Sequence, residues 1–319
     1  MKKILSLVFL FLCVTLMGCM NEKEEKQANI YIPDGTPALA LAKVLDEGFT
    51  YENIKTNFHI VQASEIAARV SQDSCDMAIM PTTAAVQLFQ RGIELQLASV
   101  NVFGNLFITG TNELNSLEEL KGKLVLTTGA TTIQMVKYVL DGNQIPYEEA
   151  GEAIDGKVAL STVNDASDII PQLKQAIIKG TELYGVLGEP QVTKAQSVVD
   201  GLKISVDLQA EYKKISSYEG YPQACLIVKK SFALENANYV KAFLDALEEN
   251  ESYLNENYTK LPEIFAKYES NLANMTFTLD TISRCNLRLE RAKEVKASVE
   301  TYVQALIKKD ISADFFLES

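Results

Sequence analysis

The stretch Ile30-Tyr31-Ile32-Pro33-Asp34-Gly35-Thr36-Pro37-Ala38-Leu39-Ala40 contains the structural unit from which the fold is built. Its β-branched and aromatic start predicts a strand, and Pro33-Asp34-Gly35 predicts a turn. Thr36 begins a predicted helix, in which Pro37 suits the first turn because its missing N–H has no helical partner there. The stretch therefore predicts a strand, a turn and a helix, with polar groups at the carboxyl end of the strand.

Strand-then-helix units of this kind recur along the chain, which is the pattern of a mostly parallel sheet flanked by helices. The predicted strands are residues 30–32, 58–61, 77–80, 95–102, 106–109, 123–126, 158–160, 183–187 and 224–228. The predicted helices are residues 36–45, 64–71, 82–90, 131–140 and 166–179, one that begins near residue 190, and the amphipathic segments 239–253, 261–268 and 292–307. The sequence thus predicts an α/β protein.

The extended segments 95–102 and 106–109 separate two series of these units, so we predict two lobes joined by crossover strands. Lobe one comprises residues 29–107 and 224–319, and lobe two comprises residues 108–223. Each lobe is predicted to be a mostly parallel sheet flanked by helices. Because ligands of open α/β sheets bind outside the carboxyl ends of the strands, we expect a binding site in a cleft between the lobes.

The N-terminus is typical of an exported protein. Lys2 and Lys3 precede an apolar run over residues 4–17, which is too short to cross a bilayer and ends in Leu16-Met17-Gly18-Cys19. This segment resembles a bacterial lipoprotein signal, which implies that residues 1–18 are removed and that Cys19 carries lipid. Residues 19–28 read as a polar, lipidated tether. The alternative is a plain secretory signal in which Cys19 is incidental.

Charge and composition exclude several classes of function. Removing residues 1–18 takes away two lysines and no acidic residue, so the formal charge moves from −12 to −14. Such an acidic chain lacks the basic clusters that nucleic acid requires. The single histidine, His59, and the absence of zinc-protease, paired-cysteine, Walker A and dinucleotide-binding motifs argue against hydrolase, metal-uptake and nucleotide-binding classes. We therefore predict no enzyme activity, no metal and no cofactor.

Processing removes Cys13 and places lipid on Cys19, which leaves three cysteines with a free side chain: Cys75, Cys225 and Cys285. Three thiols cannot all pair. One disulfide or three buried thiols both fit the sequence.

Polar residues follow several predicted strands at the point where a helix begins. Thr36 follows the first strand, Thr82 and Thr83 follow residues 77–80, and Thr131 and Thr132 follow residues 123–126. A threonine here either caps its helix or, with the free N–H groups of the helix start, holds a small polar ligand. Another such junction, Gly188-Glu189-Pro190, carries an acid, which either stabilises the helix start or accepts a hydrogen bond from a ligand amine.

These motifs, taken in order, resemble a known family. Residues 30–40, Asp76-Met77-Ala78-Ile79-Met80-Pro81-Thr82-Thr83 and Asn101-Val102-Phe103-Gly104-Asn105-Leu106 look like the solute-binding lipoproteins of ABC importers. The branch they resemble is the nitrate, sulfonate, taurine and thiamine-precursor group. Residues 120–123, 188–190 and 283–286 add to the resemblance, which covers nearly the whole mature chain. It implies the type II periplasmic-binding-protein fold.

By this resemblance a defined set of residues should line the cleft. The predicted ligand-binding residues are Thr36, Pro37, Thr82, Thr83, Asn101, Phe103, Asn105, Thr131, Thr132, Glu189 and Tyr221. Phe103, Tyr218 and Tyr221 are candidates for stacking on a planar ligand, with ordinary packing as the alternative. Arg284 is a candidate for reaching an anion, with a paired or solvated guanidinium as the alternative.

The resemblance also implies a function. The expected protein is a solute-binding lipoprotein on the outer face of the bacterial cytoplasmic membrane, held there by lipid on Cys19. It should capture a small polar or heteroaromatic solute and deliver it to an ABC permease with its ATPase. The alternatives are a sensor lipoprotein with the same fold and a pyrimidine or menaquinone-pathway enzyme on this scaffold. Such enzymes act in the cytoplasm, so the lipoprotein signal argues against them.

Overall fold

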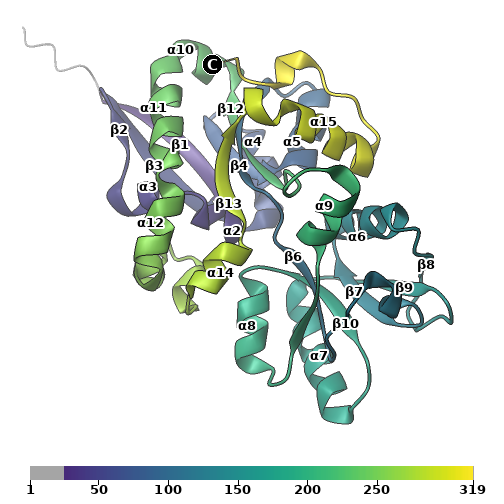
Figure 1. Cartoon of the computed structure of the whole chain (residues 1–319). Helices are drawn as coiled ribbons and strands as arrows, with labels where there is room; N and C mark the ends of the chain where they lie inside the picture. The colour runs from purple at the N-terminus through teal and green to yellow at the C-terminus, as the bar shows by residue number, and fades with distance from the viewer. Residues whose placement is uncertain (1–24, 319) are drawn as a thin grey trace, which may run out of the picture.

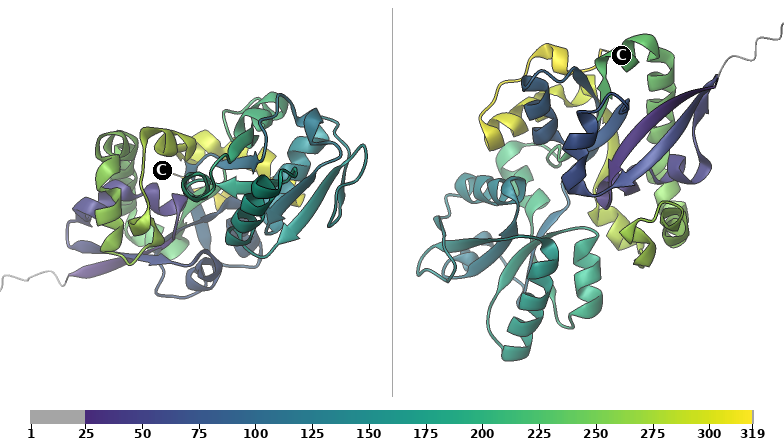
Figure 2. Two further views of the ribbon diagram at one scale, coloured as in Figure 1. Left: turned by 90° about the horizontal axis from the view of Figure 1, so that it is seen from below. Right: turned by 180° about the vertical axis from the view of Figure 1, so that it is seen from behind.

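Two β-sheets, each flanked by helices, form the structure, a computed structural model that describes residues 25–318 (Figure 1). The predicted signal peptide and the predicted lipidation at Cys19 lie outside the described residues. Figure 2 shows from behind that the two sheets and their helices form an upper and a lower body. We call the narrower junction between the two bodies the waist. The predicted two-lobed α/β organisation is confirmed.

The first sheet has the strand order β13-β5-β12-β4-β1-β3-β2. Its strands are β1 (Lys26–Pro33), β2 (Thr50–Tyr51), β3 (Ile54–Val61), β4 (Met77–Pro81), β5 (Leu95–Val102), β12 (Ala224–Lys229) and β13 (Leu287–Arg291). β1 is parallel to β3 and β4, whereas β12 runs antiparallel to β4 and β5 and β13 runs antiparallel to β5. The carboxyl ends of β1, β4 and β5 therefore share one edge with the start of β12.

The second sheet has the order β11-β6-β10-β7-β9-β8. Its strands are β6 (Leu106–Gly110), β7 (Leu124–Thr128), β8 (Tyr147–Glu149), β9 (Val158–Val163), β10 (Tyr184–Gly188) and β11 (Lys203–Asp207). The strands β7, β8, β9 and β10 are parallel, and β6 runs antiparallel to β10 and β11. β6 begins at Leu106, two residues before residue 108, where lobe two is predicted to start. The residue bounds of the two lobes stay a prediction.

Helices cover both sheets. They are α2 (Thr36–Leu39), α3 (Ala42–Glu47), α4 (Ile66–Val70), α5 (Thr82–Gln90), α6 (Ala130–Gly142), α7 (Ala166–Lys179), α8 (Gln191–Val198), α9 (Leu208–Ser216), α10 (Lys230–Glu235), α11 (Ala237–Glu248), α12 (Asn250–Asn257), α13 (Leu261–Ala266), α14 (Leu279–Arg284) and α15 (Ala292–Ile307). Single 3-10 turns occupy residues 63–65, 117–120, 258–260, 271–274 and 313–315.

Two predicted helices are each divided in the structure. The predicted helix 36–45 is broken between α2 and α3, and the predicted helix 239–253 is broken between α11 and α12. The buried amide of Asn250 joins the two breaks. It donates to the backbone oxygen of Leu39 and accepts from the backbone N–H of Lys43, both at 3.0 Å. This polar contact satisfies backbone groups that a continuous helix would have used internally.

The chain crosses between the sheets at Phe103–Asn105 and again over residues 208–223. The two crossings are tied by a pair of amides: Asn105 N–H donates to Gln223 Oε1 at 3.1 Å, and Gln223 Nε2 donates to Asn105 Oδ1 at 2.9 Å. Gly104, with φ of +90°, lies against the ring of Tyr221. A Cβ at this position would stand 2.6 Å from that ring, so only glycine permits the approach.

A row of tyrosines runs beside these crossings. Tyr138 of α6, Tyr212 of α9, Tyr221 and Tyr302 of α15 follow one another with ring centroids 5.8, 5.4 and 5.8 Å apart. The row starts on the second sheet's helices and ends on the first sheet's, so apolar packing continues through the waist on this side.

Candidate functional site

Carboxyl ends of strands from both sheets converge at the waist. α2 and α5 begin there directly after β1 and β4, and α6 begins after β7. None of these three helices has a side-chain cap on its first turn. Some of their first backbone N–H groups already have acceptors, since Ala38 N–H donates to Gly35 O at 2.9 Å and Thr82 N–H donates to Gln223 O at 3.1 Å. Only the remaining N–H groups of these helix starts are open to a ligand. This is the edge at which the sequence predicts the cleft.

Three predicted site residues meet there in one buried cluster. Thr36 Oγ1 donates to the backbone oxygen of Glu189 at 2.5 Å. Asn105 Nδ2 donates to Thr36 Oγ1 at 2.7 Å and to the same Glu189 oxygen at 2.9 Å, and Glu189 N–H donates to Asn105 O at 3.0 Å. The cluster joins lobe one, the crossing and lobe two.

The Glu189 carboxylate is held by side chains of both lobes. Its side chain is 0% exposed, and Oε1 accepts from Arg284 Nε at 2.6 Å. Thr193 of α8 donates from its backbone N–H to Oε2 at 3.2 Å and from its hydroxyl at 2.9 Å. Arg284, on α14, also donates from Nη2 to Thr193 Oγ1 at 3.1 Å. Thr193 was not predicted, although its position four residues after Glu189 on a predicted helix start was a usable signal.

The threonines of α5 lie directly beside the second crossing. Thr82 and Thr83 are buried, and Thr82 N–H donates to Gln223 O at 3.1 Å. The buried hydroxyl of Thr82 has no hydrogen-bond partner among the described residues. Burying an unpaired hydroxyl is costly, and Thr82 has no exposed surface in this structure.

The other predicted threonines and Pro37 are more accessible. Thr131 is exposed and Thr132 is half-buried on the first turn of α6, and Pro37 is half-buried on α2. Thr131 and Thr132 are in lobe two, whereas Pro37 is in lobe one. Their role in binding stays a prediction.

The aromatic candidates are packed inside the protein. Phe103 is 1% exposed, and the guanidinium carbon of Arg288 lies 3.4 Å from its ring centroid. Tyr221 is equally buried and donates to Gln209 Oε1 at 2.9 Å, and burial raises its pKa well above the usual value. Tyr218 is half-buried and packs at the edge of the same core. Stacking of Phe103, Tyr218 or Tyr221 on a ligand stays a prediction.

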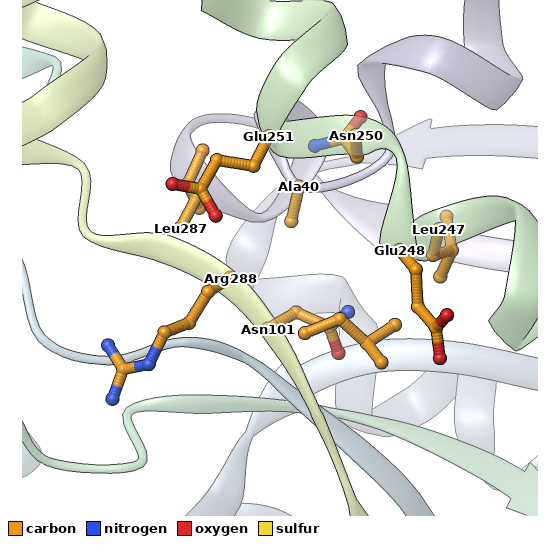
Figure 3. Close-up of a pocket in the computed structure, with 9 residues that line it drawn as sticks. Ala40, Asn101, Leu247, Glu248, Asn250, Glu251, Leu287 and Arg288 are labelled. Atoms are coloured by element: carbon orange, nitrogen blue, oxygen red, sulfur yellow. The ribbon is translucent and has the colours of Figure 1, made fainter.

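Asn101 lines a separate small cavity of about 180 Å³ between β13 and the junction of α11 with α12 (Figure 3). Its Oδ1 accepts from Ser99 Oγ at 2.9 Å. Ala40, Leu247 and Leu287 supply apolar walls, so the cavity lies on the face of the first sheet that α11 and α12 cover. The structure thus does not bring Asn101 into hydrogen-bond contact with the Thr36–Asn105–Glu189 cluster.

Residues tied to catalysis or metals are sparse. His59 stacks on Tyr31 with ring centroids 4.6 Å apart, and burial lowers its pKa. Across residues 25–318, no group of three His, Cys, Asp or Glu side chains is placed to hold a metal ion. Nor does any helix in that range have the length and apolar character to span a bilayer.

The three cysteines of the described chain are free and buried. Burial raises the pKa of Cys75 and of Cys225 to about 12, and it raises the pKa of Cys285 as well. Of the two arrangements that the sequence left open, the structure has three separate buried thiols.

No protein-family model matches this chain, and no curated protein sequence matches it. Solved structures match over nearly the full length. An ABC transporter protein from Parabacteroides distasonis is 20% identical with a TM-score of 0.71, covering 92% of this chain and 99% of its own. The alkanesulfonate-binding protein SsuA from Xanthomonas axonopodis pv. citri, bound to MOPS, is 11% identical with a TM-score of 0.60, covering 93% and 99%.

The periplasmic aliphatic sulphonate-binding protein SsuA from Escherichia coli is 13% identical with a TM-score of 0.59, covering 91% of this chain and 96% of its own. At these identities the likeness establishes a common fold. The chain therefore has the two-lobed α/β fold of these binding proteins, as the sequence predicts.

Proposed function

We propose that this protein is the solute-binding component of an ABC import system and is not an enzyme. It captures a small polar or heteroaromatic solute between its lobes and presents it to a permease with its ATPase. The observation that carries the proposal is the meeting of Thr36, Asn105 and Glu189, which brings both lobes and the crossing between them to one point beside the uncapped starts of α2, α5 and α6. The fold shared with sulfonate-binding and other ABC-importer proteins supports it.

Binding with lobe closure follows from this arrangement. A solute in the cleft meets N–H groups and hydroxyls from lobe one, such as Thr82, and from lobe two, such as Thr131. Groups from both lobes reach the solute together only when the lobes are close, so the solute favours the closed arrangement.

We further propose that the protein works outside the cytoplasmic membrane as a lipoprotein anchored through Cys19. The sequence Leu16-Met17-Gly18-Cys19 after a short apolar run supports this anchor. In this proposal the polar residues between Cys19 and β1, which begins at Lys26, serve as the tether.

A thermal-shift panel on residues 20–319 tests the function. The panel contains sulfonates, nitrate, bicarbonate, aminopyrimidines, thiamine and riboflavin, because a solute that binds only the folded protein raises its melting temperature. At a solute concentration 100 times Kd the stabilisation is about 2.7 kcal/mol. Thr131→Val should reduce the shift, and the matched change Thr301→Val, on an exposed position of α15, should leave it unchanged. Equal loss in both variants would contradict the placement of the site in the cleft.

A further inference from the structure

One set of side chains joins the two lobes beside the crossings, and we name it the interlobe bridge: Glu189, Thr193, Thr278, Thr281 and Arg284. Glu189 and Thr193 belong to lobe two, at the end of β10 and on α8. The other three belong to lobe one, on α14 and its N-cap position. Figure 1 shows α8 and α14 next to each other at the waist, on the opposite side from α6 and α15.

The hydrogen bonds of the bridge form a directed chain that ends on the carboxylate. Thr278 and Thr281 share a bond of 3.0 Å between their hydroxyls, and Thr281 and Thr193 share another of 3.0 Å. The Glu189 carboxylate can only accept, so the Thr193 hydroxyl proton points to Glu189, while Thr193 Oγ1 accepts from Arg284 Nη2. With Thr193 as the donor to Glu189, the pattern is satisfied when each hydroxyl donates to the next, which strengthens every bond in the chain.

Both oxygens of the Glu189 carboxylate are engaged by this chain and shielded from solvent. Its two oxygens accept from Arg284 Nε, from Thr193 N–H and from the Thr193 hydroxyl, and its side chain has no exposed surface. A solute that used this carboxylate would have to displace Arg284 or Thr193. The Arg284 side chain, by contrast, is 27% exposed.

The charges are therefore compensated only while the lobes are together. If α14 moves away from α8, Glu189 loses Arg284 and both groups turn to water. If a substitution removes Glu189 or Arg284, the closed arrangement keeps the other charge buried without its counter-ion, which is strongly unfavourable. The cost falls on the closed arrangement alone, since an open cleft hydrates the remaining charge.

We propose that Glu189 is a positioning residue that acts on solute binding through Arg284 and Thr193, by setting the spacing of the lobes before any solute arrives. The bridge holds the lobes near the closed arrangement in the free protein. The solute then gains affinity because less of its binding energy is spent on closure. This inference goes beyond the proposed transport function, and its test requires no solute.

The test measures the distance between the lobes by electron spin resonance on the free protein. Ser64→Cys in lobe one and Ser167→Cys in lobe two carry the spin labels, because both serines are exposed and each follows the carboxyl end of a strand. The protein used is residues 20–319, whose native cysteines, Cys75, Cys225 and Cys285, are buried and stay unlabelled. The labelled parent should show one main distance that agrees with the structure.

Arg284→Met should lower the ratio of closed to open protein by about tenfold or more, because it leaves Glu189 buried and unpaired. Glu189→Gln should have a smaller effect in the same direction, because the Arg284 side chain, 27% exposed, can turn its guanidinium to water. Arg284→Lys should restore part of the closed population. The double variant Glu189→Gln/Arg284→Met should regain more closed protein than Arg284→Met alone, since no charge is then left without a partner.

Two matched controls separate the bridge from a general loss of charge. Arg291 pairs with Glu248 at 2.7 Å within lobe one and is 21% exposed, so Arg291→Met should leave the distance unchanged. Glu182 pairs with Lys123 within lobe two, so Glu182→Gln should also leave it unchanged. If Arg284→Met folds poorly, Thr281→Val removes a link of the chain without changing a charge and should lengthen the distance moderately.

Parent-like distances in both Arg284→Met and Thr281→Val would overturn the inference. Additive effects in the double variant would also overturn it, since they would mean that the two side chains act independently. The thermal-shift panel gives its own answer in either case, so failure of the bridge and failure of the transport function can be told apart.

Discussion

Gly104 offers a strong test of how tightly the two crossings pack. The change is Gly104→Ala, which places a Cβ 2.6 and 2.7 Å from two ring carbons of Tyr221 and 2.9 Å from Cγ of Gln209. Both neighbours are fixed: Tyr221 donates to Gln209 Oε1 at 2.9 Å, and the same oxygen accepts from Leu106 N–H at 2.9 Å. The methyl group therefore cannot be accommodated by moving one flexible side chain.

Two terms make up the expected cost. Alanine at a φ of +90° is strained, which costs about 1–2 kcal/mol. Overpacking against a fixed ring adds about 1–3 kcal/mol. Gly92 separates the terms, because it has a φ of +91° and no atom within 4 Å of its Cβ position. Gly92→Ala should cost the strain alone, and Gly104→Ala should cost the sum, about 2–5 kcal/mol.

Thermal unfolding followed by circular dichroism measures the difference between the two variants. The overpacking term should lower the melting temperature of Gly104→Ala by several degrees more than that of Gly92→Ala, at about 2–4 °C per kcal/mol. Equal melting temperatures would refute the reasoning, because they would show that the crossings yield to an added methyl group without cost.

Further predictions concern the anchor, the thiols and the site. Cys19→Ser should abolish fatty-acid labelling and release the protein from washed membranes. Unchanged labelling would exclude lipid attachment at Cys19. Burial raises the pKa of Cys75 and of Cys225 to about 12, so at pH 8 both thiols should resist alkylation in the folded protein. Both should react after the protein is unfolded in urea. Fast alkylation of the folded protein would contradict their burial. In small-angle scattering, a bound solute should reduce the radius of gyration of the Arg284→Met variant by on the order of 1 Å, as hinge closure implies. The radius of gyration of the parent protein should fall by less. Equal reductions in the two proteins would argue against a bridge that holds the lobes together. Glu189→Gln should weaken the binding of all solutes by a similar factor, because the carboxylate acts through the spacing of the lobes. Selective weakening of an amine-bearing solute by about 1–3 kcal/mol in calorimetry would instead show direct contact with the carboxylate.

The sequence determined the inner strands of both sheets. In the described chain every strand that the sequence did not predict lies at a sheet edge: β2, β13, β8 and β11. Inner strands such as β4 are buried on both faces and read as continuous apolar runs, a signal that needs no knowledge of their neighbours. Edge strands such as β13, Leu287-Arg288-Leu289-Glu290-Arg291, pair on one side only and carry charges, as edges often do. Their local pattern is therefore weak, and only the neighbouring strand makes them strands.

The site divides in the same way. Thr36 and Glu189 were named from strand-to-helix junctions, which are local features that short segments of sequence record, whereas Asn105 was named only through the family resemblance. That these three bond to one another, and that Arg284 compensates Glu189 across 95 residues of chain, was decided by tertiary structure. The energy of a buried carboxylate depends on which counter-charge the folded chain brings within hydrogen-bond distance, and sequence separation carries no information about that distance.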